Sequence, residues 1–322
     1  MSGELDVALD LFLDGLRETY GRGFQRDAGG SEPDGLVTAR DGDLSLTTAV
    51  RSLLPAGDAV WESRRRGLEE LIGDGLPARA ALWVPAGADL PADEPDVSEF
   101  AALVREAAIK LGPQEHSPVP LPAKLYLRKN ADTGGVVSVT GGLNPHWARF
   151  TERVRGSYDL DSTQLHRLPE SEEHLERLLD AVVEETETLD VGQYAVIETI
   201  DAWTVQRLSG EANVTIVGVP PAVTAEGGIS VRRNFRRILA SAGPLREAKG
   251  GTRALVVLGY YARIEQEGAT VAMRGFEPTL YSGIDFVCLV ADGVVKPLIQ
   301  PPDGLPLWTH GTTQPSGGQA SP

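Results

Sequence analysis

The sequence has little cysteine, little lysine and no long apolar run. Because Cys288 is its single cysteine, an intrachain disulfide is excluded, and we expect a reducing compartment, the cytoplasm. No apolar run reaches the roughly 18 residues that span a bilayer, so no membrane partner is expected. Residues 1–21 lack a basic region and carry acids inside their apolar pattern, which predicts an amphipathic helix rather than a signal peptide.

Basic residues are also scarce relative to acidic ones. The 30 Lys and Arg residues face 46 Asp and Glu residues, which gives a formal net charge of -16. This charge favours solubility and opposes broad, non-specific attraction to nucleic acid or anionic lipid. Any contact with a polyanion must therefore be local. The excess of arginine over lysine is typical of proteins from GC-rich bacterial genomes.

Familiar catalytic and nucleotide-binding motifs are absent from the sequence. It contains no Gly-x-Ser-x-Gly elbow, Walker loop, zincin helix or dinucleotide glycine fingerprint. The glycines that follow Glu226 are too few and differently spaced for a nucleotide loop and predict a turn. We therefore expect no cofactor.

The chain is long enough for two domains. Its 322 residues with 41% hydrophobic content can bury a sizeable core. We place the boundary near Pro169, between an N-terminal domain of mixed helices and strands (1–168) and a C-terminal α/β domain (169–308). The second domain is expected to hold a central mixed sheet flanked by helices, and residues 309–322 to form a disordered tail. The predicted fold class is mixed, α+β or α/β.

Hydrophobic periodicity predicts the elements of both domains. In the first domain these are a helix through 5–16, a loop over 24–43, a helix over 61–72, a strand over 80–85, a helix over 98–112, an extended proline-rich connection over 113–122 and a hairpin of 123–129 with 135–142. In the second they are a helix over 170–189, strands over 194–203, 204–209 and 212–221, a helix over 234–247, a strand over 252–261 and a hairpin of 283–292 with 294–302.

The order helix, three strands, helix, strand over residues 170–261 resembles the core of the PD-(D/E)XK nuclease-like superfamily. That resemblance implies an acid on the second core strand and an acid-x-Lys on the third, whose carboxylates hold Mg²⁺ while the lysine helps to orient the attacking water. The acids near those places are Glu198, Asp201 and Glu211. The third strand reads Asn-Val-Thr from Asn213 and has no lysine, so the resemblance implies a degenerate core, and Mg²⁺ is expected only if the domain is an enzyme.

Four arginines gather at the start of the predicted 234–247 helix. They are Arg232, Arg233, Arg236 and Arg237. Guanidinium groups beside free N–H groups at a helix N-terminus suit phosphate or carboxylate, and nucleic acid is an expected partner only through this cluster. The alternative is that the arginines pair with the acids of the 170–189 helix.

Three smaller features have structural readings. His146, His166 and His174 match no metal-binding spacing and are expected to pack and form hydrogen bonds. Gly141-Gly142 either forms a turn or admits a close backbone approach. Cys288 lies in an apolar strand and is expected to be a buried small hydrophobe.

The expected function is that of a non-catalytic interaction or assembly subunit, whose partner is another protein or a second copy of the chain. One alternative is a divalent-metal-dependent nucleic-acid-processing enzyme that uses Glu198, Asp201 and Glu211. Another is a module that binds a small anion or phosphate through the arginine cluster.

Overall fold

The computed structural model describes residues 3–27, 35–54, 59–169, 171–222, 231–248, 251–260 and 275–300. It has the mixed α/β fold class expected from the sequence, with two separate six-stranded sheets. The chain divides into two compact units, each built on one of the sheets. Within the described ranges, no helix combines the length and the apolar character needed to cross a membrane.

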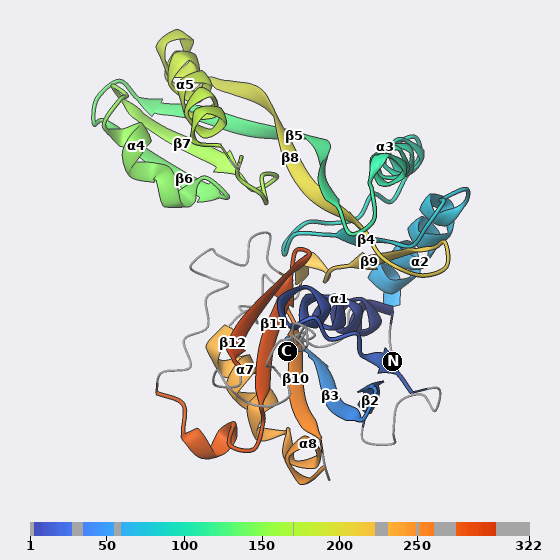
Figure 1. Cartoon of the computed structure of the whole chain (residues 1–322). Helices are drawn as coiled ribbons and strands as arrows, with labels where there is room; N and C mark the ends of the chain where they lie inside the picture. Colours follow the sequence, from blue (N-terminus) through green and yellow to red (C-terminus); the bar gives the residue numbers. More distant parts are fainter. Residues whose placement is uncertain are drawn as a thin grey trace, which may run out of the picture. The chain divides into compact units, whose positions relative to one another are not determined.

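The first unit takes its elements from both ends of the chain (Figure 1). Its sheet has the order β1-β2-β3-β10-β11-β12, with parallel pairs at the centre and antiparallel pairs toward both edges. The elements are α1 (Gly3–Tyr20), β1 (Gln25–Arg26), β2 (Leu36–Asp41), β3 (Leu44–Ser52), α7 (Val231–Ala240), α8 (Gly243–Glu247), β10 (Thr252–Leu258), the 3-10 helix η3 (Pro278–Leu280), β11 (Phe286–Ala291) and β12 (Val294–Ile299).

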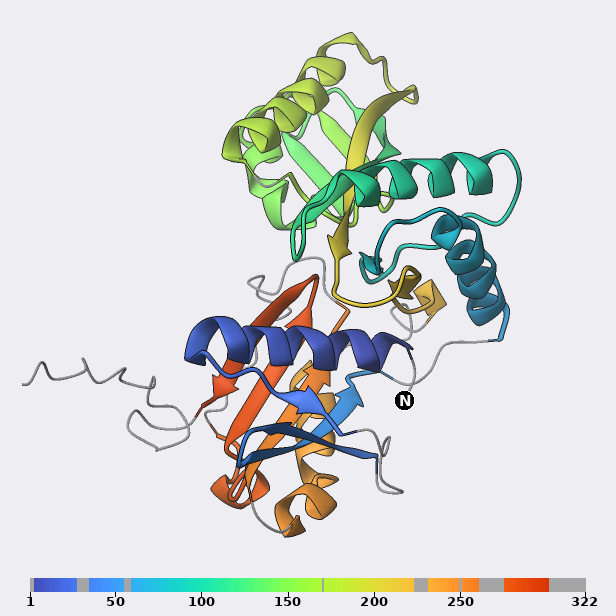
Figure 2. The same cartoon turned by 45° about the vertical axis from the view of Figure 1, so that its right-hand side comes forward.

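Helices cover both faces of this sheet. The helix α1 lies across one face, and α7 and α8 lie on the other (Figure 2). All six residues of β11 are buried, as expected for a strand between two helical layers. The hairpin predicted at the end of the chain is confirmed, because β11 and β12 join at Asp292 and Gly293, both with positive φ.

Cys288 is buried in β11, as predicted from its apolar neighbours. Burial raises the pKa of its thiol to about 12, so thiolate is scarce at neutral pH. We expect a thiol reagent such as Ellman's reagent to leave the native protein unlabelled and to label one thiol per chain after denaturation. Absorbance of the released thiolate measures this, and rapid labelling of native protein would contradict it.

The second unit runs from α2 to β9, and its sheet has the order β6-β7-β5-β8-β4-β9. Its elements are α2 (Ala59–Gly73), β4 (Ala80–Trp83), α3 (Asp96–Lys110), β5 (His116–Ala131), β6 (Val136–Gly141), the 3-10 helix η1 (Asn144–His146), α4 (Trp147–Thr151), β7 (Ser157–Ser162), α5 (Glu172–Thr188), β8 (Tyr194–Arg207) and β9 (Val214–Val217).

Two long strands, β5 and β8, pair antiparallel and form what we call the β5–β8 ribbon. One hydrophobic core lies at each end of the ribbon (Figure 1). The first core contains α2, α3, β4 and β9, with Trp203 of β8 in edge-to-face contact with Phe100. The second contains α4, α5, β6 and β7. Both cores take odd-numbered ribbon residues, such as Leu125 and Ile197, because alternate side chains of a strand share a face.

The division into units differs from the domains expected from the sequence. Residues on both sides of Pro169 belong to the second unit. The reason is the ribbon, since β5 precedes the expected boundary, β8 follows it, and the two pair along most of their length. Residues 309–322, the expected tail, lie outside the described residues.

Several predicted strands are corrected by the pairing. The strands predicted over 194–203 and 204–209 are one continuous strand, β8, which ends at Arg207. In the predicted connection over 113–122, the residues from His116 onward form the first part of β5. The predicted loop over 24–43 contains β2. The predicted hairpin of 123–129 with 135–142 is wrong, because β7 lies between β5 and β6.

Residues 170–261, which carry the nuclease-like order of elements, are shared between the two units. The helix α5 and strands β8 and β9 belong to the second unit, and α7 and β10 belong to the first. These elements therefore do not build one sheet.

Candidate interaction site

The three acids singled out by the sequence do not come together. Glu198 is exposed on one face of β8, and Asp201 is buried on the other. Glu211 is exposed in the turn after β8. From Glu198 to the end of that strand is about 30 Å, at roughly 3.3 Å per residue. Among the described residues, no group of three His, Cys, Asp or Glu side chains is placed to hold a metal ion.

Asp201 fastens a loop onto the ribbon. Its Oδ1 accepts the backbone N–H groups of His166 and Arg167, at 3.1 and 2.7 Å. Its Oδ2 accepts the indole N–H of Trp203 at 2.9 Å and lies 2.9 Å from His166 Nδ1. Arg167 extends the network by donating to the hydroxyl of Thr204. This carboxylate is a structural anchor for the segment that leads into α5.

The three histidines singled out by the sequence were predicted to pack and to form hydrogen bonds rather than to bind a metal. His166 faces Asp201, and the backbone N–H of His174 donates to Ser171, the N-cap of α5. Burial, reinforced by the charge of Arg149, lowers the pKa of His146.

The arginine cluster lies on the exposed face of α7. Val231, Asn234, Phe235, Ile238 and Leu239 are buried on the other face. The four arginines, Arg232, Arg233, Arg236 and Arg237, are exposed.

Arg232 and Arg236 have local partners in the first unit. The guanidinium carbon of Arg232 lies 4.5 Å from the ring centre of Phe276, and Arg236 Nη2 lies 3.9 Å from Glu277 Oε1. The acids of α5 form ion pairs inside the second unit instead, for example Glu172 with Arg149 at 2.6 Å. The cluster therefore has neighbours other than the α5 acids, which the sequence analysis gave as the alternative to an anion site.

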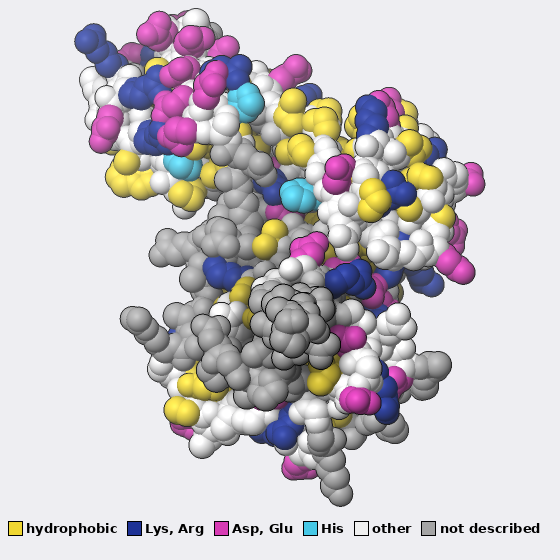
Figure 3. Space-filling model, viewed as in Figure 1, with side chains coloured by type: hydrophobic (Ala, Val, Ile, Leu, Met, Phe, Trp, Pro, Cys, Tyr) yellow, Lys and Arg dark blue, Asp and Glu magenta, His cyan; other side chains and the backbone are white. Residues whose placement is uncertain are grey.

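The even-numbered residues of the ribbon present an exposed face that is mostly apolar, with Lys124 and Glu198 opposite each other in its middle. On β8, Ile200 is 56% exposed and Val196 43% exposed, and Tyr126 of β5, opposite Val196, is 38% exposed. Pro120 and Pro122 continue this face on β5. Hydrophobic side chains gather over the stretch where β5 and β8 lie side by side (Figure 3). A cluster of large exposed apolar side chains is typical of an interaction surface.

The outer edge of β8 is unpaired beside this face. Odd-numbered residues make the ladder bonds between the two strands, as Lys129 N to Gln193 O at 3.1 Å indicates. The N–H and C=O groups of Val196, Glu198, Ile200 and Ala202 therefore point away from β5. On that side β4 pairs with β8 only from Thr204 to Arg207. No strand in the described parts of the chain pairs with Val196–Ala202 there.

A cavity of about 840 Å³ lies beside this unpaired edge. Glu198, Ile200 and Ala202 line one side of it. The other side is lined by residues of the loop and of α5, which are Arg167, Leu168, Pro169, Ser171, His174 and Leu178. Sequence reasoning missed this site, because its two walls come from segments that only the fold brings together. The one available signal for this site in the sequence was the apolar residues at alternate positions along 194–202.

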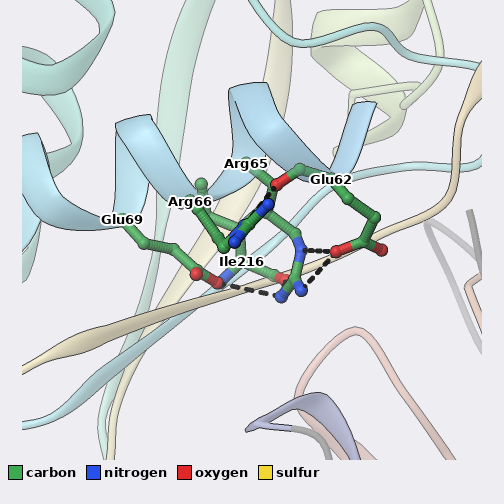
Figure 4. Close-up of polar contacts among 5 residues, drawn as sticks. All are labelled: Glu62, Arg65, Arg66, Glu69 and Ile216. Atoms are coloured by element: carbon green, nitrogen blue, oxygen red, sulfur yellow. Dashed lines mark hydrogen bonds and ion pairs between the residues drawn. The ribbon is translucent and has the colours of Figure 1, made fainter. Parts of the chain in front are cut away.

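The α2 helix closes the edge strand β9 on the far side of the same sheet. Glu69 Oε1 accepts the N–H of Ile216 at 2.8 Å, and Arg65 bridges Glu69 and Glu62 (Figure 4). Burial raises the pKa of the Glu69 carboxyl despite these bonds.

No protein-family model, curated protein or solved structure matches this chain.

Proposed function

We propose that this protein is a non-catalytic interaction or assembly subunit that binds a protein partner through the exposed apolar face of the β5–β8 ribbon. The carrying observation is the exposure of Val196, Ile200 and Tyr126 together on one face. Removing such side chains from water gives about 25 cal/mol per Å² of apolar area, which is the usual driving force of association. The net charge of -16 favours a basic partner over a second copy of the chain.

A lysine placed in this face tests the proposal. Val196→Lys is expected to weaken partner binding by about 100-fold, because it puts a charge where apolar contact is made. Val191→Lys is the matched control, since Val191 is 51% exposed and lies outside the ribbon. Full-length protein of each type would capture partners from an extract of the source cells, and calorimetry would then measure the affinity of the purified partner.

Equal retention of the same partner by wild type and Val196→Lys would refute the proposal. Sedimentation velocity on the purified chain tests self-association. A concentration-dependent dimer that Val196→Lys abolishes and Val191→Lys keeps would make the partner a second copy.

The enzyme alternative has its own test. With Mg²⁺ or Mn²⁺ added, the purified protein is expected to leave duplex and single-stranded DNA intact. The acid-x-Lys of the nuclease-like core is replaced here by Asn213-Val214-Thr215, and the acids Glu198 and Glu211 lie far apart. A gel assay measures the cleavage. Metal-dependent cleavage that Glu211→Ala removes would replace our proposal with the nuclease alternative.

A further inference from the structure

The other exposed edges of this sheet carry side chains that bond an outward N–H, or prolines that remove one. At β9, Glu69 accepts the outward N–H of Ile216 at 2.8 Å, and Arg65 Nη1 lies 3.5 Å from the outward carbonyl oxygen (Figure 4). Two charged side chains of α2 thus bond the outward N–H and C=O groups of Ile216, which a neighbouring strand would otherwise bond. At the opposite end of the sheet, Thr151 Oγ1 accepts the N–H of Val137 on β6 at 3.3 Å.

The free stretch of β5 is closed by proline. Pro118, Pro120 and Pro122 occupy the positions whose backbone nitrogens point away from β8, so this edge has no N–H to offer there. At the next such position, the N–H of Lys124 donates to Gln164 Oε1 at 3.0 Å. Natural sheets block edges in these ways because unpaired edges recruit other chains.

The edge of β8 from Val196 to Ala202 has none of these blocks. Its outward positions keep their N–H groups, since none of them is proline. In the described residues, no side chain bonds these N–H groups in the way that Glu69, Thr151 and Gln164 bond those of the other edges. The cavity of about 840 Å³ lies directly beside it and is walled partly by Leu168 and Leu178.

We infer that the edge of β8 from Val196 to Ala202 binds an extended, basic peptide segment of a partner protein as an added strand, with apolar side chains of the segment in the adjacent cavity. This inference rests on the proposed function and specifies how the partner is held. Unpaired backbone N–H and C=O groups in strand geometry match the backbone of an extended peptide. A cavity of this volume accommodates apolar groups of a ligand. The net charge of -16 favours a basic segment, and Glu198 is the acid that such a segment would meet on this edge.

Peptide selection on the full chain provides the probe. A phage-displayed library of random peptides is expected to yield basic peptides with alternating apolar residues and no proline in the central positions. With a selected synthetic peptide bound, amide exchange at Val196, Glu198, Ile200 and Ala202 is expected to slow by about tenfold or more, as measured by NMR. Failure to select any peptide, or protection confined to another element, would overturn the inference.

Proline substitution then distinguishes binding at the edge of β8 from binding at the apolar face of the ribbon. Ala202→Pro removes an outward N–H and no bond to β5, just as Pro120 does opposite it on β5. We expect an unchanged melting temperature and about tenfold or greater loss of affinity for the selected peptide. Ala202→Val keeps the N–H at similar size and should bind normally. Glu198→Pro is the second variant if Ala202→Pro folds poorly.

The two hypotheses fail differently in these measurements. If Ala202→Pro and Glu198→Pro bind the peptide as tightly as wild type but Val196→Lys does not, the partner uses the apolar face alone. Strand addition is then refuted, and the proposed interaction function stands. If Val196→Lys also retains the natural partner, the proposed function fails as well.

Discussion

Asp201→Ala is expected to lower the free energy of unfolding by about 3 kcal/mol or more. The substitution removes the acceptor of the Trp203 indole and of two backbone N–H groups, those of His166 and Arg167. Asp201 is 3% exposed, so water cannot readily replace the carboxylate. A buried donor left without an acceptor costs about 1–3 kcal/mol. Urea unfolding followed by tryptophan fluorescence measures the change.

Glu198→Ala is the matched control for this experiment. Glu198 is on the same strand but exposed, and its replacement is expected to change the stability by no more than about 0.5 kcal/mol. A stability of Asp201→Ala within that same range would contradict the anchoring role. If Asp201→Asn keeps most of the stability that Asp201→Ala loses, one side-chain oxygen is enough to anchor the loop.

Asp201 illustrates what the sequence could not reveal about the candidate site. Its residue type and strand position were read from the sequence as those of a metal-binding acid. Its hydrogen-bond partners on the loop are 34 and 35 residues away in the chain, and nothing local indicates that they are engaged. The role of a carboxylate depends on what surrounds it after folding, and that surrounding is set by the path of the 163–169 loop.

Four of the helices were predicted well because their signal is local, whereas the predicted helix over 234–247 is divided into α7 and α8 and begins at Val231. The apolar stripes of α1, α2, α3 and α5 recur at the helical period within one element. The predicted ends of the helices were less accurate. The helix predicted over 98–112 is α3, which begins at Asp96 after Pro95 at the N-cap and ends at Lys110.

Strand pairing was beyond the reach of local patterns. The prolines before Ala123 were read as a connection, because proline interrupts central strands. They are compatible with β5 because their nitrogens point toward its free edge, which only the register with β8 determines. The same register exposes the outward N–H groups of Val196–Ala202. The proposed binding edge therefore follows from topology, although each residue in it was visible in the sequence.

Gly142→Ala is expected to destabilise the second unit by about 3 kcal/mol or more. A Cβ at this position would lie 2.0 Å from the carbonyl oxygen of Leu165, far inside any normal contact. The sequence left a turn and a close backbone approach as alternatives for Gly141-Gly142, and the structure shows the close approach, with Gly142 itself in a turn. Leu165 directly precedes His166 and Arg167, whose N–H groups bind Asp201. Displacing its backbone should therefore also strain the anchor on β8.

The matched control for this substitution is Gly67→Ala in α2 of the same unit. No atom lies within 4 Å of the Cβ that it would add, and alanine favours a helix over glycine by about 0.5–1 kcal/mol, so a small gain in stability is expected. Urea unfolding of both variants gives the comparison, and amide exchange of His166 and Arg167 locates the effect. Equal stabilities for the two variants would mean that the 163–169 loop yields freely. Such a loop could not act as a fixed wall of the cavity beside β8, so this result would also weaken the case for strand addition at that edge.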